Sequence, residues 1–322
     1  MGCEIGFDAP RMAAEPGNDR PAWQGRNKAK PPPPVQCVCE KIAVRWFQVK
    51  CVAVVTLYGH HVDNALQDVV YGGSDVKQLL IYDRPVPLNR DKHRDLRILM
   101  AAGDMRFAAA INSAPVAAIE FGRAATEYPI VFAGSAVDSV VPAVLMGLRD
   151  SENLMVGADG LWADQAYIPA FLRRYPFVLA DKPGSEDDFT VCLDEGCPGL
   201  GTEAGEPLFT DSGEDGPLLS NALQFLGDYQ QQMKRTQEFV ARLQALDLLH
   251  SKVIRVQPVA APEFTLQGLF VVDEAKLRAL KARVVHKLMG DGDLGLIYAH
   301  LLSLSNVVRL THRMDARRAA VN

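Results

Sequence analysis

Short runs of apolar residues, separated by turn residues, recur along the chain from Val76 onward. Runs of this length predict buried or half-buried strands. The expected strands lie at Gln78–Tyr82, Ile130–Phe132, Val140–Leu148, Phe177–Ala180, Phe189–Leu193, Val253–Val259 and Phe264–Val272. Several of them follow one another with no predicted helix between them, which favours an antiparallel or mixed sheet over a doubly wound parallel one.

A different period, alternating between three and four residues, runs through Pro217–Leu249. Its apolar or small positions are Leu219, Ala222, Leu226, Tyr229, Met233, Thr236, Val240 and Leu243. This spacing places them on one face of a helix roughly 45–50 Å long. Two interpretations stay open: a core helix laid along a sheet or against another helix, and a homodimeric coiled coil.

Three further helices are predicted from capping residues and periodic apolar positions. Val116–Ala125 follows a cap-like stretch with a proline, and Asp273–Arg283 begins with Asp273 as its cap. Asp293–Thr311 is apolar on one face, and the basic tail from His312 is expected to fray. The predicted fold class is therefore α+β: a mixed or antiparallel sheet packed with a long amphipathic helix and a C-terminal helix.

Two prolines bracket the stretch Tyr167–Leu179, which joins a short helix to a strand. Pro169 suits the first turn of a helix, where a missing N–H costs nothing. Pro176 disfavours the α region at Tyr175, so the helix is expected to stop there.

The same stretch supplies the arginines of the candidate ligand site. Arg173 and Arg174 adjoin Tyr167, and adjacent helical positions point about 100° apart, so at most one arginine is expected to face Tyr167. One interpretation is recognition of a carboxylate or another anion, which suits the planar guanidinium. The other is a structural ion pair, for which the acidic candidates are Glu120, Glu127 and Glu206.

His300 completes the candidate site, because it lies on the mostly apolar helix around Tyr298–Leu302. A histidine there is either a hydrogen-bonded core residue or a ligand or base. Cys192 and Cys197 lack a second Cys or His pair at zinc spacing, so reduced thiols and no metal site are expected. Around Gly199–Gly201 the sequence is acidic and lacks the spacing of a phosphate loop. No cofactor and no assigned catalytic residue follow from the sequence.

Composition narrows the function classes further. The net charge of −5 argues against nucleic-acid binding as the main activity. No apolar run approaches the roughly 18–20 residues of a membrane span, and the first residues do not resemble a secretory signal. A cytoplasmic location is therefore the expectation from sequence.

Residues 1–75 differ from the rest, with a tetraproline at Pro31–Pro34 and no sustained period. They are interpreted as translated upstream sequence, a disordered tail or a small module, and the first of these is favoured because the pattern begins abruptly at Val76. The expected organisation is a leader over residues 1–75, one domain over 76–314 and a tail over 315–322.

The chain from Val76 to Met314, about three quarters of it, resembles the SapC family of bacterial proteins. The stretches that carry the resemblance are Lys77–Tyr82, His93–Leu96, Glu127–Phe132, Leu148–Leu154, Tyr167–Leu179, Gly205–Phe209, Gly268–Glu274 and Ile297–Leu304. The resemblance implies an association with a paracrystalline surface layer and a place at the cell surface. It implies no catalytic residues.

Two hypotheses of different classes follow. The first is a surface-layer-associated or protein-interaction component, soluble and without cofactor, with protein partners or a homodimer. The second is a cytoplasmic enzyme or peptide-binding accessory with a site built from Tyr167, Arg173, Arg174 and His300.

Overall fold

A computed structural model describes residues 81–321, except for 102, 182–188 and 260. The chain divides into two compact units, Met1–Trp46 and Phe47–Asn322, and all described residues belong to the second. The predicted leader, with its tetraproline and four cysteines, therefore lies outside the described residues.

A five-stranded antiparallel sheet with the order β10-β11-β4-β5-β3 forms the centre of this unit. Its strands are β3 (Ser113–Pro115), β4 (Ile130–Ala133), β5 (Val141–Leu145), β10 (Leu249–Val256) and β11 (Phe264–Val272). β4 is buried on both faces: Ile130 and Phe132 join one apolar cluster, while Val131 and Ala133 join another. Burial on both faces explains why β4 reads as a continuous apolar run.

Two three-stranded antiparallel sheets, β1-β7-β6 and β8-β2-β9, lie beyond the central one. Their strands are β1 (Pro85–Pro87), β2 (Arg97–Ile98), β6 (Phe177–Asp181), β7 (Phe189–Asp194), β8 (Leu200–Gly201) and β9 (Glu206–Pro207). The strand predicted at Gln78–Tyr82 is not found over its described part, since Ile81 lies in a turn and Tyr82 belongs to no strand. Strand β1 instead contains two prolines, which an edge strand tolerates.

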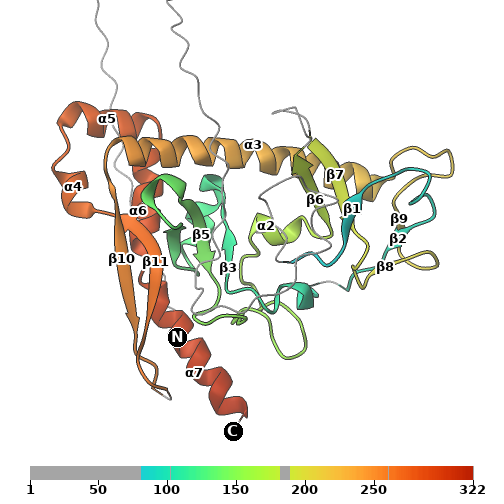
Figure 1. Ribbon diagram of the computed structural model, residues 1–322, viewed down its shortest axis with the longest axis horizontal. Helices are drawn as coiled ribbons and strands as arrows, with labels where there is room; N and C mark the ends of the chain where they lie inside the picture. The colour runs from blue at the N-terminus through green and yellow to red at the C-terminus, as the bar shows by residue number, and fades with distance from the viewer. Residues whose placement is uncertain (1–80, 102, 182–188, 260, 322) are drawn as a thin grey trace, which may run out of the picture. The chain divides into compact units, whose positions relative to one another are not determined.

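The long helix α3 (Pro217–Ala245) runs past both β5 and β6, as Figure 1 shows. Its buried residues are Leu219, Leu226, Tyr229, Thr236, Phe239, Val240 and Leu243. This is the face that the spacing predicted, and it matches a core helix laid along a sheet. The helix ends before Leu249 because Asp247 has a positive φ of 53° and Leu249 already pairs in β10.

The remaining helices are short, apart from the last two. They are α1 (Phe121–Ala124), α2 (Ala170–Arg173), α4 (Glu274–Arg278), α5 (Ala282–Gly290), α6 (Asp293–Ser303) and α7 (Asn306–Val321). Asp273 caps α4 as expected, because its carboxylate accepts hydrogen bonds from the N–H groups of Ala275 and Lys276. The helix predicted at Val116–Ala125 reduces to a 3-10 turn (Ala118–Glu120) and α1, because Ser113–Pro115 pairs with β5.

The C-terminal segment also differs from the expectation. A break after Ser303 divides the predicted helix into α6 and α7, and α7 continues through His312 to Val321. Leu310 and Met314 pack into the second apolar cluster, and Arg317 donates hydrogen bonds to two main-chain carbonyls. These contacts hold the basic tail in a helix, where the sequence suggested fraying.

One helical stretch among the described residues, Asp293–Ala320, is long and apolar enough to cross a membrane by length and composition alone. A core helix meets the same criteria, and 39% of the most apolar window is buried inside the protein. In this fold, α6 packs against β4, β11 and α1.

Candidate functional site

Tyr167 and Arg173 meet on the outer side of α2. The Arg173 Nε donates a hydrogen bond to the Ile168 carbonyl at 3.1 Å, and its Nη2 donates to the Tyr167 hydroxyl at 3.3 Å. The guanidinium lies 5.8 Å from the centre of the Tyr167 ring and 5.1 Å from the centre of the Phe225 ring. Arg173 is exposed and is held by two acceptors between two aromatic rings.

The buried carboxylate of Glu120 fixes Tyr167 from below. It accepts hydrogen bonds from the Tyr167 hydroxyl at 2.7 Å and from the main-chain N–H groups of Ala117 and Ala170. Burial and the bond to Glu120 raise the pKa of Tyr167 to about 12. The Tyr167 N–H donates in turn to Glu127 at 2.8 Å. Two acidic residues therefore set the conformation of the chain that enters α2.

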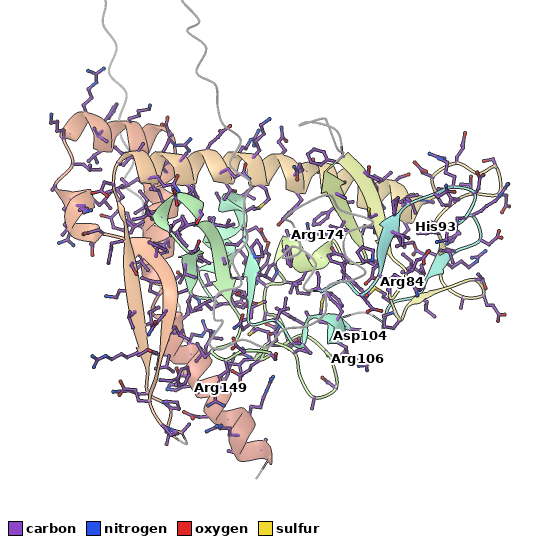
Figure 2. The ribbon with its side chains drawn as sticks, viewed as in Figure 1. Arg84, His93, Asp104, Arg106, Arg149 and Arg174 are labelled. Carbon is purple, nitrogen blue, oxygen red and sulfur yellow. The ribbon has the colours of Figure 1, made fainter. Side chains whose placement is uncertain are left out.

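Arg174 lies beneath α3 (Figure 2) and is only 7% exposed. Its guanidinium lies 4.3 Å from the ring centre of Phe171, 5.5 Å from that of Tyr229 and 5.7 Å from that of Tyr82. Its Nε and Nη2 have no hydrogen-bond partner, and no described carboxylate lies within 4.0 Å. Aromatic faces therefore surround this cation, with the Tyr82 hydroxyl beside it.

A second buried polar cluster follows α2 directly. The Tyr175 ring stacks on Phe107 with 4.0 Å between ring centres, and its hydroxyl lies beside Asp194 and the Cys197 thiol. Burial raises the pKa of both Tyr175 and Cys197. Cys192 and Cys197 are both free and buried. A raised pKa leaves Cys197 protonated near neutral pH, where a thiol is a poor nucleophile.

His300 lies elsewhere, in the core between α6 and the central sheet, and is 0% exposed. Its Nδ1 lies 2.9 Å from the Ile130 carbonyl, and its Nε2 accepts a hydrogen bond from the Val272 N–H at 3.1 Å. This pattern assigns the proton to Nδ1. Both ring nitrogens are engaged with the main chain, so neither is available to a substrate.

The four residues of the predicted site thus have three different surroundings. Tyr167 and Arg173 are in contact, whereas Arg174 contacts aromatic rings beneath α3 and His300 joins two strands of the central sheet. The alternative interpretation, an ion pair from either arginine to Glu120, Glu127 or Glu206, is not found among the described contacts. Glu120 reaches Arg173 only through the Tyr167 hydroxyl.

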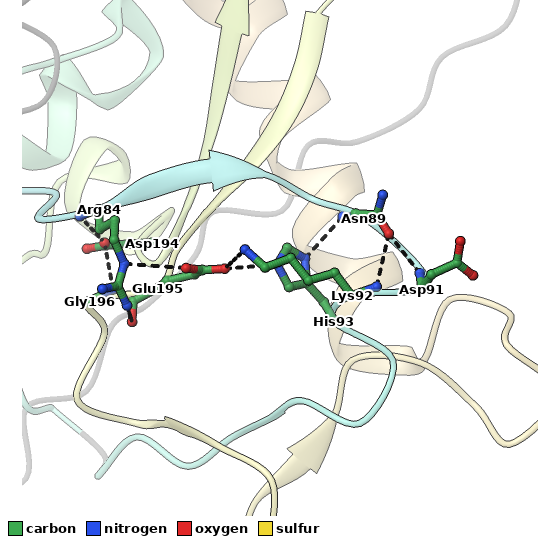
Figure 3. A network of polar contacts seen from close by, with 8 residues as sticks. All are labelled: Arg84, Asn89, Asp91, Lys92, His93, Asp194, Glu195 and Gly196. Carbon is green, nitrogen blue, oxygen red and sulfur yellow. Dashed lines mark hydrogen bonds and ion pairs between the residues drawn. The ribbon is translucent and has the colours of Figure 1, made fainter. Parts of the chain in front are cut away.

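A separate polar network joins the residues on both sides of β1 to the end of β7, as Figure 3 shows. Glu195 lies 2.5 Å from the Lys92 Nζ, 3.2 Å from the His93 Nε2 and 3.3 Å from the Arg84 Nε. The Lys92 ammonium is the main cause that lowers the pKa of Glu195, with His93 and Arg84 adding to it.

The neighbouring Asp194 ties the segment before β1 to the end of β7 through the main chain. Its carboxylate accepts hydrogen bonds from the N–H groups of Asp83, Arg84 and Gly196. The His93 Nδ1 accepts from the Asn89 N–H, so its Nε2 carries the proton that faces Glu195. With both nitrogens engaged, this His–Glu pair holds the two segments together and has no free nitrogen for proton transfer.

The described residues contain no group of three or more His, Cys, Asp or Glu side chains that could hold a metal ion. Sequence reasoning missed the network around Glu195 and the anchoring role of Glu120. The partners are far apart in the chain, as His93 and Glu195 are at 102 positions' separation. No local spacing signals such a contact.

Replacing Glu120 with glutamine is expected to lower the free energy of unfolding by about 1–3 kcal/mol. A glutamine has one acceptor oxygen for the three donors that the carboxylate serves, so in either orientation its NH2 group would face a main-chain N–H. Urea unfolding measures this change. The exposed Glu238→Gln on α3 is the control and is expected to change stability by less than about 0.5 kcal/mol. Equal stability of the two variants would contradict the anchoring role.

Comparison with known proteins gives one match. The model of the family described as SapC matches residues 88–310, which cover the described strands from β2 through β11 and the helices through α6. No curated protein and no solved structure matches the chain.

Proposed function

The chain belongs to the SapC family, and from this premise we propose that it is a protein-interaction component associated with a bacterial surface layer. The observation that carries the proposal is an apolar and basic surface on the C-terminal helices. Tyr298 and Leu302 lie one turn apart on the solvent face of α6 and are 42% and 72% exposed. Apolar side chains left exposed in this way are typical of contact sites for a partner.

The neighbouring helices carry further exposed apolar residues. Met289 on α5 and Val308 on α7 are also exposed large apolar residues, and α5 packs against α6. Exposed basic residues accompany them at Arg283, Lys287 and Arg313. We call these residues, with Tyr298 and Leu302, the C-terminal surface. The whole chain has a net charge of −5, so its basic residues at this surface stand out from the rest. A basic and apolar surface favours an acidic partner protein with apolar side chains.

The buried polar groups also support a binding role. His93 and His300 each have both ring nitrogens hydrogen-bonded within the protein, and the Glu120 carboxylate serves three internal donors. These groups fix the main chain and leave no free base or nucleophile among them. Groups fixed in this way are typical of a scaffold that presents a surface.

Replacing Leu302 with glutamate is expected to weaken binding to the isolated cell-surface fraction of the source cells by about tenfold or more. The substitution removes apolar contact area and places a negative charge opposite an acidic partner. Co-sedimentation of the purified protein measures this. The matched control is Leu99→Glu. Leu99 is also an exposed leucine, at 62%, and it lies outside the C-terminal surface.

Two outcomes would contradict the proposal. The first is a wild-type protein that stays in the supernatant, and the second is equal binding by the two variants. Protease treatment of the surface fraction separates the remaining alternatives. Binding that survives the treatment, and is matched by anionic lipid vesicles, would assign the C-terminal surface to a membrane instead of a protein.

A second candidate, the peptide-binding accessory, is favoured by a different observation. Arg173 is exposed, held in place and without an acidic partner among the described residues. Of the four residues in the site predicted from sequence, only Tyr167 and Arg173 belong to this candidate site.

A further inference from the structure

We propose that Arg173, held between Tyr167 and Phe225, forms a binding site for a carboxylate group. The inference goes beyond the proposed surface-layer role, because none of these residues belongs to the C-terminal surface. It rests on the way the protein occupies one edge of the guanidinium and leaves another edge to solvent.

A guanidinium has five N–H groups, and the Arg173 side chain uses two of them within the protein. The Nε donates to the Ile168 carbonyl and the Nη2 donates to the Tyr167 hydroxyl, so both bonds lie on the Nε–Nη2 edge. The remaining edge presents one N–H from each Nη atom in parallel. That edge matches the two oxygens of a carboxylate.

The charge of Arg173 is also available to a ligand. Several arginines in the described chain have an acidic partner, for example Arg242 with Asp293 and Arg90 with Asp215. No described carboxylate lies within 4.0 Å of the Arg173 guanidinium, and no described residue accepts a hydrogen bond from its Nη1.

The surroundings hold the guanidinium before any ligand arrives. The guanidinium lies near two rings, those of Tyr167 and Phe225. Glu120 fixes the Tyr167 ring through its hydroxyl, and Phe225 belongs to the long helix α3. An exposed arginine normally loses rotamer freedom when it binds an anion. Here two hydrogen bonds and two aromatic rings restrict the side chain in advance, which lowers that entropic cost.

The two rings also indicate the class of carboxylate. A ligand that meets the free edge lies beside aromatic surface as well as positive charge, so an organic carboxylate gains contacts that a small inorganic anion does not. The α-carboxylate of a peptide and the side chain of an acidic residue share this chemistry. A planar bidentate carboxylate suits the single free edge better than a tetrahedral phosphate, which usually recruits several cationic or N–H donors.

The test uses NMR titration of the full-length protein with N-acetylphenylalanine as the probe. We expect binding with a dissociation constant on the order of 1–10 mM, as is typical of one ion pair with a small apolar contact. Shifts are expected in the amide signals of α2 and in the ring of Phe225. N-acetylphenylalaninamide, which lacks the charge, is expected to cause no such shifts.

Two substitutions of Arg173 separate the effect of its bidentate geometry from that of its charge. Arg173→Ala is expected to abolish measurable binding, and Arg173→Lys to weaken it about tenfold, because lysine keeps the charge but loses the bidentate edge. The control Arg235→Ala removes an exposed arginine from α3 and is expected to bind as the wild type does. The lysine variant keeps the test valid if the alanine variant does not fold.

Two further probes fix the ligand class. N-acetylglutamic acid α-amide offers a side-chain carboxylate, whereas N-acetylphenylalanine offers an α-carboxylate. The probe that binds more tightly shows which source of carboxylate is preferred. Either result supports the proposal. Binding of phenyl phosphate without binding of either carboxylate would overturn it. Equal affinity of the wild type and Arg173→Ala for the carboxylates, or no binding by the wild type, would also overturn it and leave Arg173 as a support for Tyr167. None of these results depends on whether Leu302 mediates surface binding.

Discussion

Replacing Asp293 with alanine is expected to lower the free energy of unfolding by about 3 kcal/mol. Asp293 is 1% exposed, and its two carboxylate oxygens accept hydrogen bonds from the Arg242 Nε at 2.6 Å and Nη2 at 2.8 Å. The pair joins the end of α3 to the start of α6. Removing one partner of a buried ion pair costs about 3–5 kcal/mol because the other charge is left uncompensated.

The lower end of that range applies here, because the Arg242 side chain is 37% exposed and water can solvate it after the substitution. Urea unfolding monitored by circular dichroism measures the change. The control is Asp228→Ala, an exposed position on α3, which is expected to change stability by less than about 0.5 kcal/mol. A loss below about 1 kcal/mol in the Asp293 variant would show that the pair does not hold α3 to α6.

A second substitution distinguishes the pair from packing alone. Asp293→Asn keeps the size and one acceptor oxygen but removes the charge, so it is expected to lose an intermediate amount of stability. If Asp293→Asn and Asp293→Ala lower the free energy of unfolding equally, the charge itself is the important part of the contact. If asparagine costs nothing, hydrogen bonding and shape suffice.

The parts of the fold that sequence reasoning predicted well are those fixed by local periodicity. The buried face of α3 follows directly from apolar positions three and four apart, and β4 follows from a short apolar run. The stop before Tyr175 follows from the restriction that Pro176 places on its neighbour, with α2 ending at Arg173. Each of these features depends on residues that are close in the chain.

The sequence predictions that were wrong share a different cause, since each of these elements depends on a partner that is distant in the chain. Ser113–Pro115 becomes a strand because it pairs with Ala143–Leu145, and nothing within ten residues of it indicates that contact. The tail beyond His312 stays helical because Arg317 donates to the carbonyls of Asn153 and Val156. Tertiary contacts override local preference in both places.

The candidate site shows the same division. Adjacent helical positions point in different directions, so the separation of Arg173 from Arg174 follows from local geometry. The partners of those arginines do not: Tyr167 is anchored by Glu120, which lies 47 positions earlier, and Phe225 comes from another helix. Residues so far apart in the chain share no local pattern that would connect them.

Lowering the pH from about 7 to 4 is expected to destabilise the protein through His300. Burial is the main cause that lowers the pKa of His300 from 6.5 to about 4, and the nearby His250 adds to it. The ring has Phe132 on one side, its Nδ1 donates to the Ile130 carbonyl and its Nε2 accepts from the Val272 N–H. Protonation of Nε2 would set a charged donor against that N–H in the core.

The sign follows from the two states. Between pH 6.5 and 4 the unfolded chain binds a proton at this histidine and the folded chain does not, so the proton stabilises the unfolded state. Stability is therefore complete above about pH 6.5, falls as the pH drops toward 4, and loses no more from this residue below that. The fall in pKa from 6.5 to about 4 corresponds to about 3 kcal/mol.

Urea unfolding between pH 7.5 and 4.5 tests this expectation against His300→Gln, which keeps an acceptor and a donor but does not titrate. Other groups titrate in both proteins, so the difference between the two curves isolates His300, and its slope is expected to appear below pH 6.5. The exposed His312→Gln is the control and is expected to keep the wild-type slope. NMR titration of the wild type gives the pKa directly if the glutamine variant does not fold. A value at or above 6 would contradict the neutral, doubly bonded histidine, because a ring that accepts the Val272 N–H in the core cannot be protonated near neutral pH without losing that bond.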